Sequence, residues 1–315
     1  MIIRSKPITD HPMTYQNPNA DFKILADRKQ EYLNFESNQA LTWCEGCGNF
    51  GIQKALERAL VLEGIKVPDV LLCFDIGCNG NGSDKIAGTG GITFHGLHGR
   101  VISAAAGAAL ANPRIKVVAS AGDGATFSEG PGHLLHAVRS NYPMVFILHN
   151  NENFALTTGQ ASATTRKGFP MNGSPDGVVL DPINACDFVL GLKPSFVARS
   201  FSGDVNHMTD ILRSALRHNG FAFVEMLQLC PTYNRATSYE WLSQRVQYLK
   251  TTPKTIEAAR KAAADMEEKI NVGILYQNVE SPNFLERLPN RKGVKTALVD
   301  EVKAYDIKKL TSQFE

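Results

Sequence analysis

Short apolar segments alternate with helical patterns along most of this chain, and this alternation restricts the fold more than any other feature. Several runs have the length and composition of buried strands: residues 70–76, 116–121, 144–148, 195–199 and 221–227. Helical spacing of apolar or small residues fills most of the gaps between them: residues 49–64, 99–110, 131–140 and 205–217. Strands joined through helices pair in parallel. We therefore expect an α/β fold with a mostly parallel sheet flanked by helices.

The rest of the chain divides by composition. Residues 1–40 are polar and predict an irregular N-terminal extension. The regular pattern predicts a principal domain over 41–250. The last part, 251–315, is expected to be a C-terminal helix and tail, with a charged amphipathic helix over 252–270 and a short strand over 272–276.

Charge and cysteine content limit the function classes. The 315 residues include 33 basic and 31 acidic side chains, so the balance gives no reason to expect nucleic acid or an anionic membrane as partner. No stretch approaches the roughly 20 apolar residues that span a bilayer, and the N-terminus lacks the apolar core of a signal peptide. We expect a cytoplasmic protein, in which the 6 cysteines serve as ligands or core residues in preference to disulfides.

Oxygen-bearing side chains follow two of the expected strands. Gly122-Asp123-Gly124 comes directly after one strand, and Asn150-Asn151 after the next. The glycines let the backbone approach a phosphate closely, and carboxylate and amide oxygens suit Mg²⁺, which commonly shares its shell with phosphates. Each half alone is most often a turn or a loop. Their joint placement at strand ends favours a metal and phosphate site.

Cysteines mark a second site. Cys44 and Cys47 form a Cys-x-x-Cys before an expected helix, while Cys78 and Cys230 each follow a strand. Four thiolates match the needs of a cubane [4Fe–4S] cluster. A tetrahedral zinc site has the same ligand count and stays the alternative, although the second Cys-x-x-Cys that would favour it is lacking. The other cysteines lie in apolar segments and are expected to be core thiols: Cys73 and Cys186.

Taken together and in order, these motifs resemble the β subunits of 2-oxoacid:ferredoxin oxidoreductases. The shared segments are Trp43-Cys44-x-Gly46-Cys47-Gly48-Asn49, Ile76-Gly77-Cys78, His95-Gly96-Leu97-His98-Gly99-Arg100, Gly122-Asp123-Gly124, Leu156-Thr157-x-Gly159-Gln160-Ala161-Ser162 and Cys230-Pro231-Thr232-Tyr233-Asn234. The resemblance runs from Trp43 to about residue 235. It is greatest to the two-subunit branch that contains 2-oxoglutarate and broad-range 2-oxoacid enzymes.

The resemblance implies a thiamine-diphosphate-binding fold with a magnesium ion and a [4Fe–4S] cluster. It assigns Mg²⁺ to the side chains of Asp123 and Asn151 and to the carbonyl of Asn153. It assigns the cluster to the cysteines Cys44, Cys47, Cys78 and Cys230. The cofactor-binding residues that it implies are Gly77, Gly122, Asp123, Gly124, Asn151, Asn153, Leu156 and Thr157.

The activity implied is the coenzyme A-dependent oxidative decarboxylation of a 2-oxoacid. Thiamine diphosphate acts as an electron sink at the old carbonyl carbon, and the cluster passes electrons on to ferredoxin. In related enzymes the glutamate that activates the cofactor comes from the other subunit, so we expect an α subunit in an αβ or α2β2 assembly. The leading substrate is 2-oxoglutarate, with pyruvate or a broad range of 2-oxoacids as the alternative.

Three residues of the His-Gly-Leu-His-Gly-Arg segment are expected to be catalytic: His95, His98 and Arg100. They would contact cofactor, substrate carboxylate or coenzyme A. Packing and helix capping are their alternative roles.

The chain departs from its relatives at Glu45, at Asn79-Gly80-Asn81-Gly82 and at Thr158, where many relatives have lysine. Thr158 cannot bind a carboxylate by charge. We therefore expect Arg100 to do so, because guanidinium binds a planar carboxylate bidentately, with Lys85 second and the partner subunit third.

Two other functions compete. A carboligase or decarboxylase that uses thiamine diphosphate would not need the four cysteines. A simple iron–sulfur electron carrier would not need Asp123 or Asn151. Iron content and cofactor binding separate the three.

Overall fold

A computed structural model describes residues 18–35, 39–87, 91–294, 296–302 and 312. Its centre is one eight-stranded sheet in the order β2-β1-β3-β4-β6-β5-β8-β7. The strands are β1 (Val70–Phe74), β2 (Ile92–His95), β3 (Lys116–Gly122), β4 (Val145–Asn150), β5 (Phe196–Phe201), β6 (Ala222–Leu227), β7 (Val246–Tyr248) and β8 (Ile270–Gln277). Every neighbouring pair is parallel except β5 with β8. The expected mostly parallel α/β fold is confirmed.

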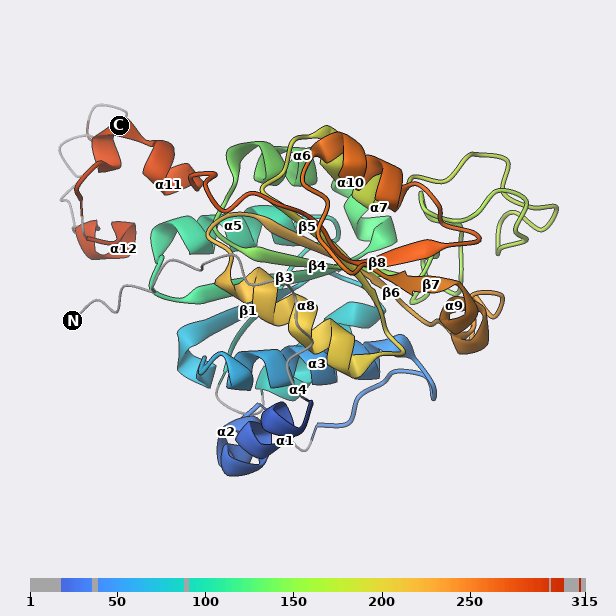
Figure 1. Cartoon of the computed structure of the whole chain (residues 1–315), viewed down its shortest axis with the longest axis horizontal. Coiled ribbons are helices and arrows are strands. Elements are labelled where there is room, and N and C mark those ends of the chain that lie inside the picture. Colours follow the sequence, from blue (N-terminus) through green and yellow to red (C-terminus); the bar gives the residue numbers. More distant parts are fainter. Residues whose placement is uncertain (1–17, 36–38, 88–90, 295, 303–311, 313–315) are drawn as a thin grey trace.

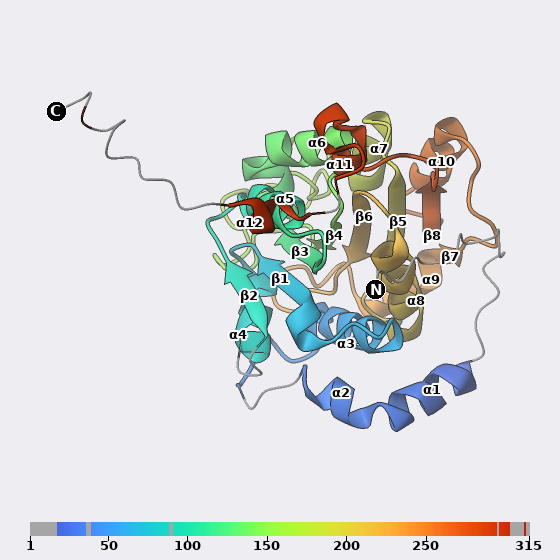
Figure 2. The ribbon, with the colours of Figure 1, turned by 90° about the vertical axis from the view of Figure 1, so that its left-hand side faces the viewer.

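Helices cover both faces of the sheet, as Figure 2 shows. One face carries α3 (Gly48–Leu62) and α8 (Val205–Arg217), and the other carries α5 (Val101–Ala111), α6 (Pro131–Ser140), α7 (Ala185–Gly191) and α10 (Ile256–Ala263). The remaining helices are α1 (Pro18–Asp27), α2 (Lys29–Leu33), α4 (Gly82–Ala87), α9 (Tyr239–Arg245), α11 (Phe284–Arg287) and α12 (Leu298–Glu301). None of the helices in the described part of the chain combines the length and apolar character required to cross a membrane.

The core lies in two layers, because successive side chains of a strand point to opposite faces. In β3, Val117 and Ala119 pack with α5 and α6, while Val118 packs with α3 and α8. Central strands buried on both faces read as continuous apolar runs. This is why the sequence identifies β3, β4 and β6 within one or two residues at each end.

The N-terminal expectation is wrong in the part that the structure describes. Residues 18–33 are not irregular but form α1 and α2, which lie against α3 (Figure 2). Arg213 of α8 donates to Glu63 at 2.8 Å and lies 3.3 Å from Asp21 of α1. Ion pairs and a few buried side chains such as Phe35 attach α1 and α2 to the rest of the fold. Such contacts come from distant parts of the chain and leave no local apolar pattern.

Two helix predictions also need correction. The helix expected over 49–64 begins one residue earlier, at Gly48, and ends at Leu62, and its Asn49 side chain bonds to His149. The expected helix over 252–270 is much shorter, Ile256–Ala263. Its end is explained by Asp265, whose carboxylate accepts the backbone N–H groups of residues 267–269 at 2.9–3.1 Å. An aspartate bonded to nearby backbone in this way stabilises a turn in place of a helix.

Candidate active site

A cavity of about 90 Å³ opens at the carboxyl ends of β1, β3, β4 and β6. Its lining includes most of the predicted cofactor-binding residues, one of the four predicted cluster cysteines, Cys78, and one of the predicted catalytic residues, His98; the cofactor-binding residues are Gly77, Gly122, Gly124, Asn151, Asn153, Leu156 and Thr157. Parallel strands place their carboxyl ends on one edge, where ligands of such sheets bind. Residues from four loops therefore meet in one space.

Asp123 lies behind the cavity wall and is fully buried. Its Oδ1 accepts the N–H of Asn151 at 3.3 Å, and its Oδ2 accepts the hydroxyls of Ser162 and of Thr164, the latter at 2.7 Å. Burial raises the pKa of this carboxyl to about 6, although these hydrogen bonds oppose the shift. A nearby cation would favour the charged form, so the environment of Asp123 suits a metal ligand.

Asn151 and Asn153 form a compact polar turn beside Asp123. The Asn151 Oδ1 accepts the N–H of Asn153 at 3.1 Å, and the Asn153 amide donates to the Asn151 carbonyl at 2.8 Å. The Asn153 Oδ1 is buried without a hydrogen-bond partner among the described residues. Buried polar atoms normally have a partner. Oxygen ligands are thus concentrated where the sequence predicts Mg²⁺, and the residues present fit that ion.

Gly124 keeps the backbone accessible at this site. A Cβ atom at position 124 would overlap the ring of Phe154, which lines the same cavity. Glycine is therefore required for close packing here and not for an unusual backbone angle.

A buried polar network lies behind the predicted metal ligand Asp123, inside the sheet. Arg199 of β5 bonds to Glu225 of β6 at 2.7 Å, and neither side chain is exposed. Glu225 in turn accepts the Asn150 amide at 2.7 Å, and Asn150 Oδ1 lies 2.9 Å from the Thr164 hydroxyl. The network ends beside Asp123, so it orients the groups that surround that carboxylate.

The predicted cluster cysteines lie within one another's electrostatic reach. Burial raises the pKa of Cys47 to about 11 and that of Cys78 to about 12, and the nearby thiolates, including Cys44 and Cys230, add to both shifts. Bound iron supplies the positive charge that makes such thiols ligands. The Gln228 amide donates to Cys47 Sγ at 3.5 Å. This grouping and this donor fit an iron–sulfur cluster.

As the side chains stand, no group of three or more Cys, His, Asp or Glu residues in the described ranges could hold one metal ion. A tetrahedral zinc site with Zn–S of about 2.3 Å would need sulfur atoms roughly 3.8 Å apart.

The fold places the side chains of the His-Gly-Leu-His-Gly-Arg motif in different surroundings. His98 lines the cavity, where its Nδ1 lies 2.9 Å from Glu129 Oε1 and its ring meets Phe154 edge-on. Arg100 lies outside the cavity lining and donates to the carbonyls of Gly99 and Glu129 at 3.1 and 3.0 Å.

The remaining substrate candidates lie elsewhere. His95 is exposed at the end of β2, 3.4 Å from the Ser83 hydroxyl. Thr158 sits in a turn with φ +80°. The Lys85 side chain falls outside the described residues.

Sequence reasoning missed several residues of the cavity: Ile76, His149, Phe154 and Gln228. His149 is the last residue but one of β4, directly before the Asn-Asn pair, and its Nδ1 lies 2.8 Å from Asn49 Oδ1. Burial lowers the pKa of His149 to about 3, so the ring is neutral. Their positions directly after expected strands could have identified His149 and Gln228 as candidate site residues. The local sequence, however, does not show that their side chains face the cavity.

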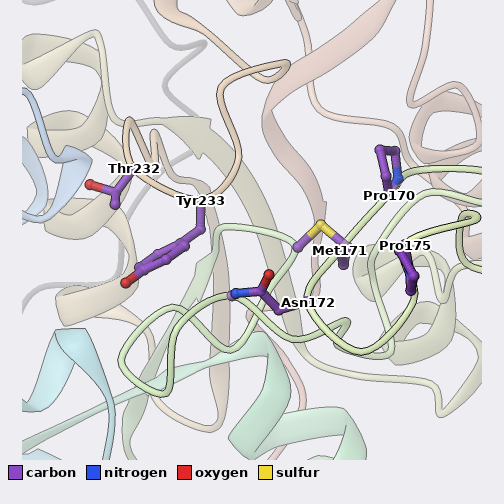
Figure 3. A pocket seen from close by; sticks show the side chains of 7 residues that line it. Pro170, Met171, Asn172, Pro175, Thr232 and Tyr233 are labelled. Atoms are coloured by element: carbon purple, nitrogen blue, oxygen red, sulfur yellow. The ribbon is translucent and has the colours of Figure 1, made fainter.

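A second, wider hollow of about 390 Å³ lies beside this site. Figure 3 shows Thr232 and Tyr233 on one side of it and Pro170, Met171 and Pro175 on the other. The loop over 151–184 that carries these prolines projects beyond the sheet in Figure 1. Tyr233 also packs against Gly159, where a Cβ atom would lie 2.7 Å from its ring.

Comparison with known proteins agrees with this geometry. Residues 75–226 match the family described as thiamine pyrophosphate enzyme, C-terminal TPP binding domain, and residues 230–293 match the C-terminal part of the pyruvate ferredoxin oxidoreductase beta subunit. The chain is 36% identical over 263 residues to a 2-oxoacid:ferredoxin oxidoreductase subunit beta from Sulfolobus, covering 78% of this chain and 85% of that one.

Further relatives carry 2-oxoglutarate in their names. The 2-oxoglutarate oxidoreductase subunit KorB of Mycobacterium tuberculosis is 36% identical over 66% of this chain and 55% of its own. A solved 2-oxoglutarate:ferredoxin oxidoreductase from Magnetococcus marinus, with 2-oxoglutarate, coenzyme A and succinyl-CoA bound, superposes with a TM-score of 0.80 at 28% identity, covering 90% of this chain and 96% of that one. The chain therefore belongs to the β-subunit family of 2-oxoacid:ferredoxin oxidoreductases and carries its thiamine-diphosphate-binding domain.

Proposed function

We propose that this chain, together with an α subunit, oxidatively decarboxylates 2-oxoglutarate with coenzyme A and passes the electrons through a [4Fe–4S] cluster to ferredoxin. The observation that carries this proposal is the single cavity lined both by the Gly122–Gly124 and Asn151–Asn153 loops and by Cys78. A carbon centre that loses electrons and a cluster that accepts them must lie close together. Neither a carboligase nor a simple electron carrier needs that proximity.

The residues have separable tasks in this reaction. Asp123, Asn151 and the Asn153 carbonyl would hold Mg²⁺ against the cofactor diphosphate, and Cys44, Cys47, Cys78 and Cys230 would hold the cluster. Thiamine diphosphate supplies an electron sink for the decarboxylated carbon when it is bound.

Other side chains of the cavity control its polarity. The neutral ring of His149 and the apolar side chains of Ile76, Phe154 and Leu156 limit water in the cavity. A drier site strengthens the electrostatic interactions within it.

Substrate binding is assigned by position. His98 is the member of the predicted triad that lines the cavity, and Glu129 contacts both His98 and Arg100. We propose that His98 faces the substrate. Arg100 would position the His98 side chain through Glu129. The α subunit would then supply the main charge for the substrate carboxylate.

This division predicts unequal kinetic effects in the assembled enzyme. Arg100→Gln removes a contact to the Glu129 carbonyl and should lower kcat/KM by roughly three- to tenfold. His98→Asn should lower it further. Equal activity of both variants and wild type with every 2-oxoacid would place substrate binding wholly in the partner.

The proposed function is tested on protein co-purified anaerobically with its α subunit. Iron and zinc analysis should give about four irons per chain. A panel of 2-oxoglutarate, pyruvate and other 2-oxoacids should reduce a low-potential acceptor only with coenzyme A present. Stoichiometric zinc would reject the cluster. Substrate turnover without acceptor reduction would indicate the non-redox alternative, and faster turnover of pyruvate would replace 2-oxoglutarate as the substrate.

A further inference from the structure

Gln228 is the one residue in the described part of the chain whose side chain both lines the cofactor cavity and donates to a cluster cysteine. We propose that Gln228 is a positioning residue that raises the reduction potential of the cluster through its hydrogen bond to Cys47. The inference deepens the proposed function and rests on the cluster assigned there. It gives the electron-accepting side of the site a residue that no sequence motif indicates.

The backbone around Gln228 holds its side chain in place. Its N–H donates to the Asn150 carbonyl at 2.8 Å, next to the proposed magnesium ligands. The following residue, Leu229, donates to the Ser202 hydroxyl at 3.0 Å and accepts the N–H of Gly48 at 2.9 Å. The end of β6 is therefore tied to the start of α3, where Cys47 lies. Gln228 is buried, with 2% of its surface exposed, so it has little freedom to turn away.

The orientation of the amide follows from the chemistry of sulfur. A cluster-bound thiolate only accepts hydrogen bonds, so the nitrogen of the Gln228 amide faces Cys47 Sγ and its oxygen faces away. Burial raises the pKa of the Cys47 thiol, and the backbone of Asn49 opposes this shift. Cys44, by contrast, is exposed to solvent. Protein donors thus serve the partly buried Cys47, which water reaches less.

Hydrogen bonds to cluster sulfur shift the potential in a known direction. One-electron reduction takes a [4Fe–4S] cluster from its 2+ to its 1+ core, and the added negative charge spreads onto the thiolates. A donor bonds more strongly to the more negative sulfur. Gln228 therefore stabilises the reduced state and makes the cluster a better acceptor for electrons that leave the adjacent cavity.

The test compares two glutamines changed in the same way. Gln228→Met keeps length and volume but cannot donate, so the equilibrium constant for cluster reduction should fall roughly three- to tenfold, where tenfold is about 59 mV for one electron. Gln53→Met is the matched control. Gln53 is also buried, on α3, but its amide donates to the Glu57 carboxylate at 2.9 Å and not to sulfur. The reduction potential of the cluster in Gln53→Met should equal that of wild type.

The measurement is an anaerobic redox titration of the αβ complex followed by electron paramagnetic resonance, with iron content and thiamine-diphosphate affinity determined on each variant. A lower potential in Gln228→Met alone, with iron retained, supports the inference. An unchanged potential overturns it, as does loss of iron from Gln228→Met alone, which would make the residue purely structural. Weaker cofactor binding at an unchanged potential would assign Gln228 to the cofactor only. A wild-type protein without iron would instead refute the proposed function.

Discussion

At the scale of single residues, burial decides what the polar groups of this protein do. Asp123 was identifiable from its glycine neighbours, but its hydroxyl donors Ser162 and Thr164 lie 39 and 41 residues further along the chain. Ser162 belongs to the Gly-Gln-Ala-Ser segment. That segment therefore supplies a hydrogen-bond donor to the proposed metal ligand Asp123.

The charge of Asp123 can be removed without changing the size of the side chain. Asp123→Asn should weaken binding of thiamine diphosphate with Mg²⁺ by at least about 100-fold. Loss of a residue that only supports a metal ligand costs up to about 100-fold in affinity, and loss of a charged ligand should cost at least as much. Calorimetry on the αβ complex measures the affinity, and iron content should stay unchanged. Asp181→Asn, which alters an exposed carboxylate paired with Lys167, serves as the control. Wild-type affinity in Asp123→Asn would contradict the assignment.

A buried histidine should make stability depend on pH. Burial, aided by the charge of Lys116, lowers the pKa of His218 from near 6.5 to about 4, and its Nε2 lies 2.7 Å from the Ser195 hydroxyl. As pH falls below 6.5, the unfolded chain binds the proton before the folded one does. The stability contributed by the neutral ring is therefore lost between about pH 6.5 and 4, by up to about 3 kcal/mol.

His218→Gln should flatten the dependence of unfolding free energy on pH across this range, as measured by urea denaturation at several pH values. His136→Gln changes an exposed histidine of α6 and should leave the slope as in wild type. Identical slopes for all three proteins would show that His218 is protonated in the folded state as readily as in the unfolded one.

At the scale of elements, the register between strands brings charges together in the core. Arg199 of β5 lies directly opposite Glu225 of β6. Burial would raise the pKa of Glu225, but Arg199 and the hydrogen bonds around it lower it overall, so the pair is ionised. Each strand alone looks like an ordinary apolar run interrupted by one charge.

Breaking this pair should be costly. Arg199→Met leaves a buried carboxylate without its partner and should lower the free energy of unfolding by about 3–5 kcal/mol. The double variant Arg199→Met with Glu225→Gln should recover most of that loss, because no unpaired charge remains. Urea denaturation of both measures the coupling. A double variant as unstable as the single one would assign the loss to packing in place of charge.

At the scale of the whole molecule, the sheet ends in an incompletely covered edge. β2 is one of the two edge strands, and the apolar side chains of Ile92, Phe94 and the nearby Leu97 are 50%, 42% and 79% exposed. Open strand edges and grouped apolar side chains are typical of interaction surfaces. The next residue in the sequence, His98, lines the cavity. An α subunit that completes the active site would cover it.

Phe94→Glu combined with Leu97→Glu should therefore weaken association with the α subunit. Loss of two large apolar contacts is worth about 3 kcal/mol or more, which is roughly 100-fold in Kd. Co-purification and analytical ultracentrifugation measure the change. Val279→Glu alters another exposed apolar side chain and should not affect assembly. An intact complex in the double variant would place the interface elsewhere.

The sequence by itself determined the parallel sheet, because buried strands and amphipathic helices leave periodic apolar patterns that need no knowledge of distant contacts. It also placed the groups of the site at strand ends, since the residues after parallel strands gather at one edge of the sheet: Cys78, Asp123, Asn151 and Cys230.

Only the tertiary structure decided which side chains turn inward there. Gln228 meets Cys47, and His149 meets Asn49, across 181 and 100 residues of sequence. Arg100 turns to backbone carbonyls while His98 enters the cavity. An ion pair ties α1 to α8, and pairing with β1 forms the edge strand β2. A turn around Asp265 follows the early end of α10. Such interactions join particular atoms across the fold, and a local periodicity cannot encode them.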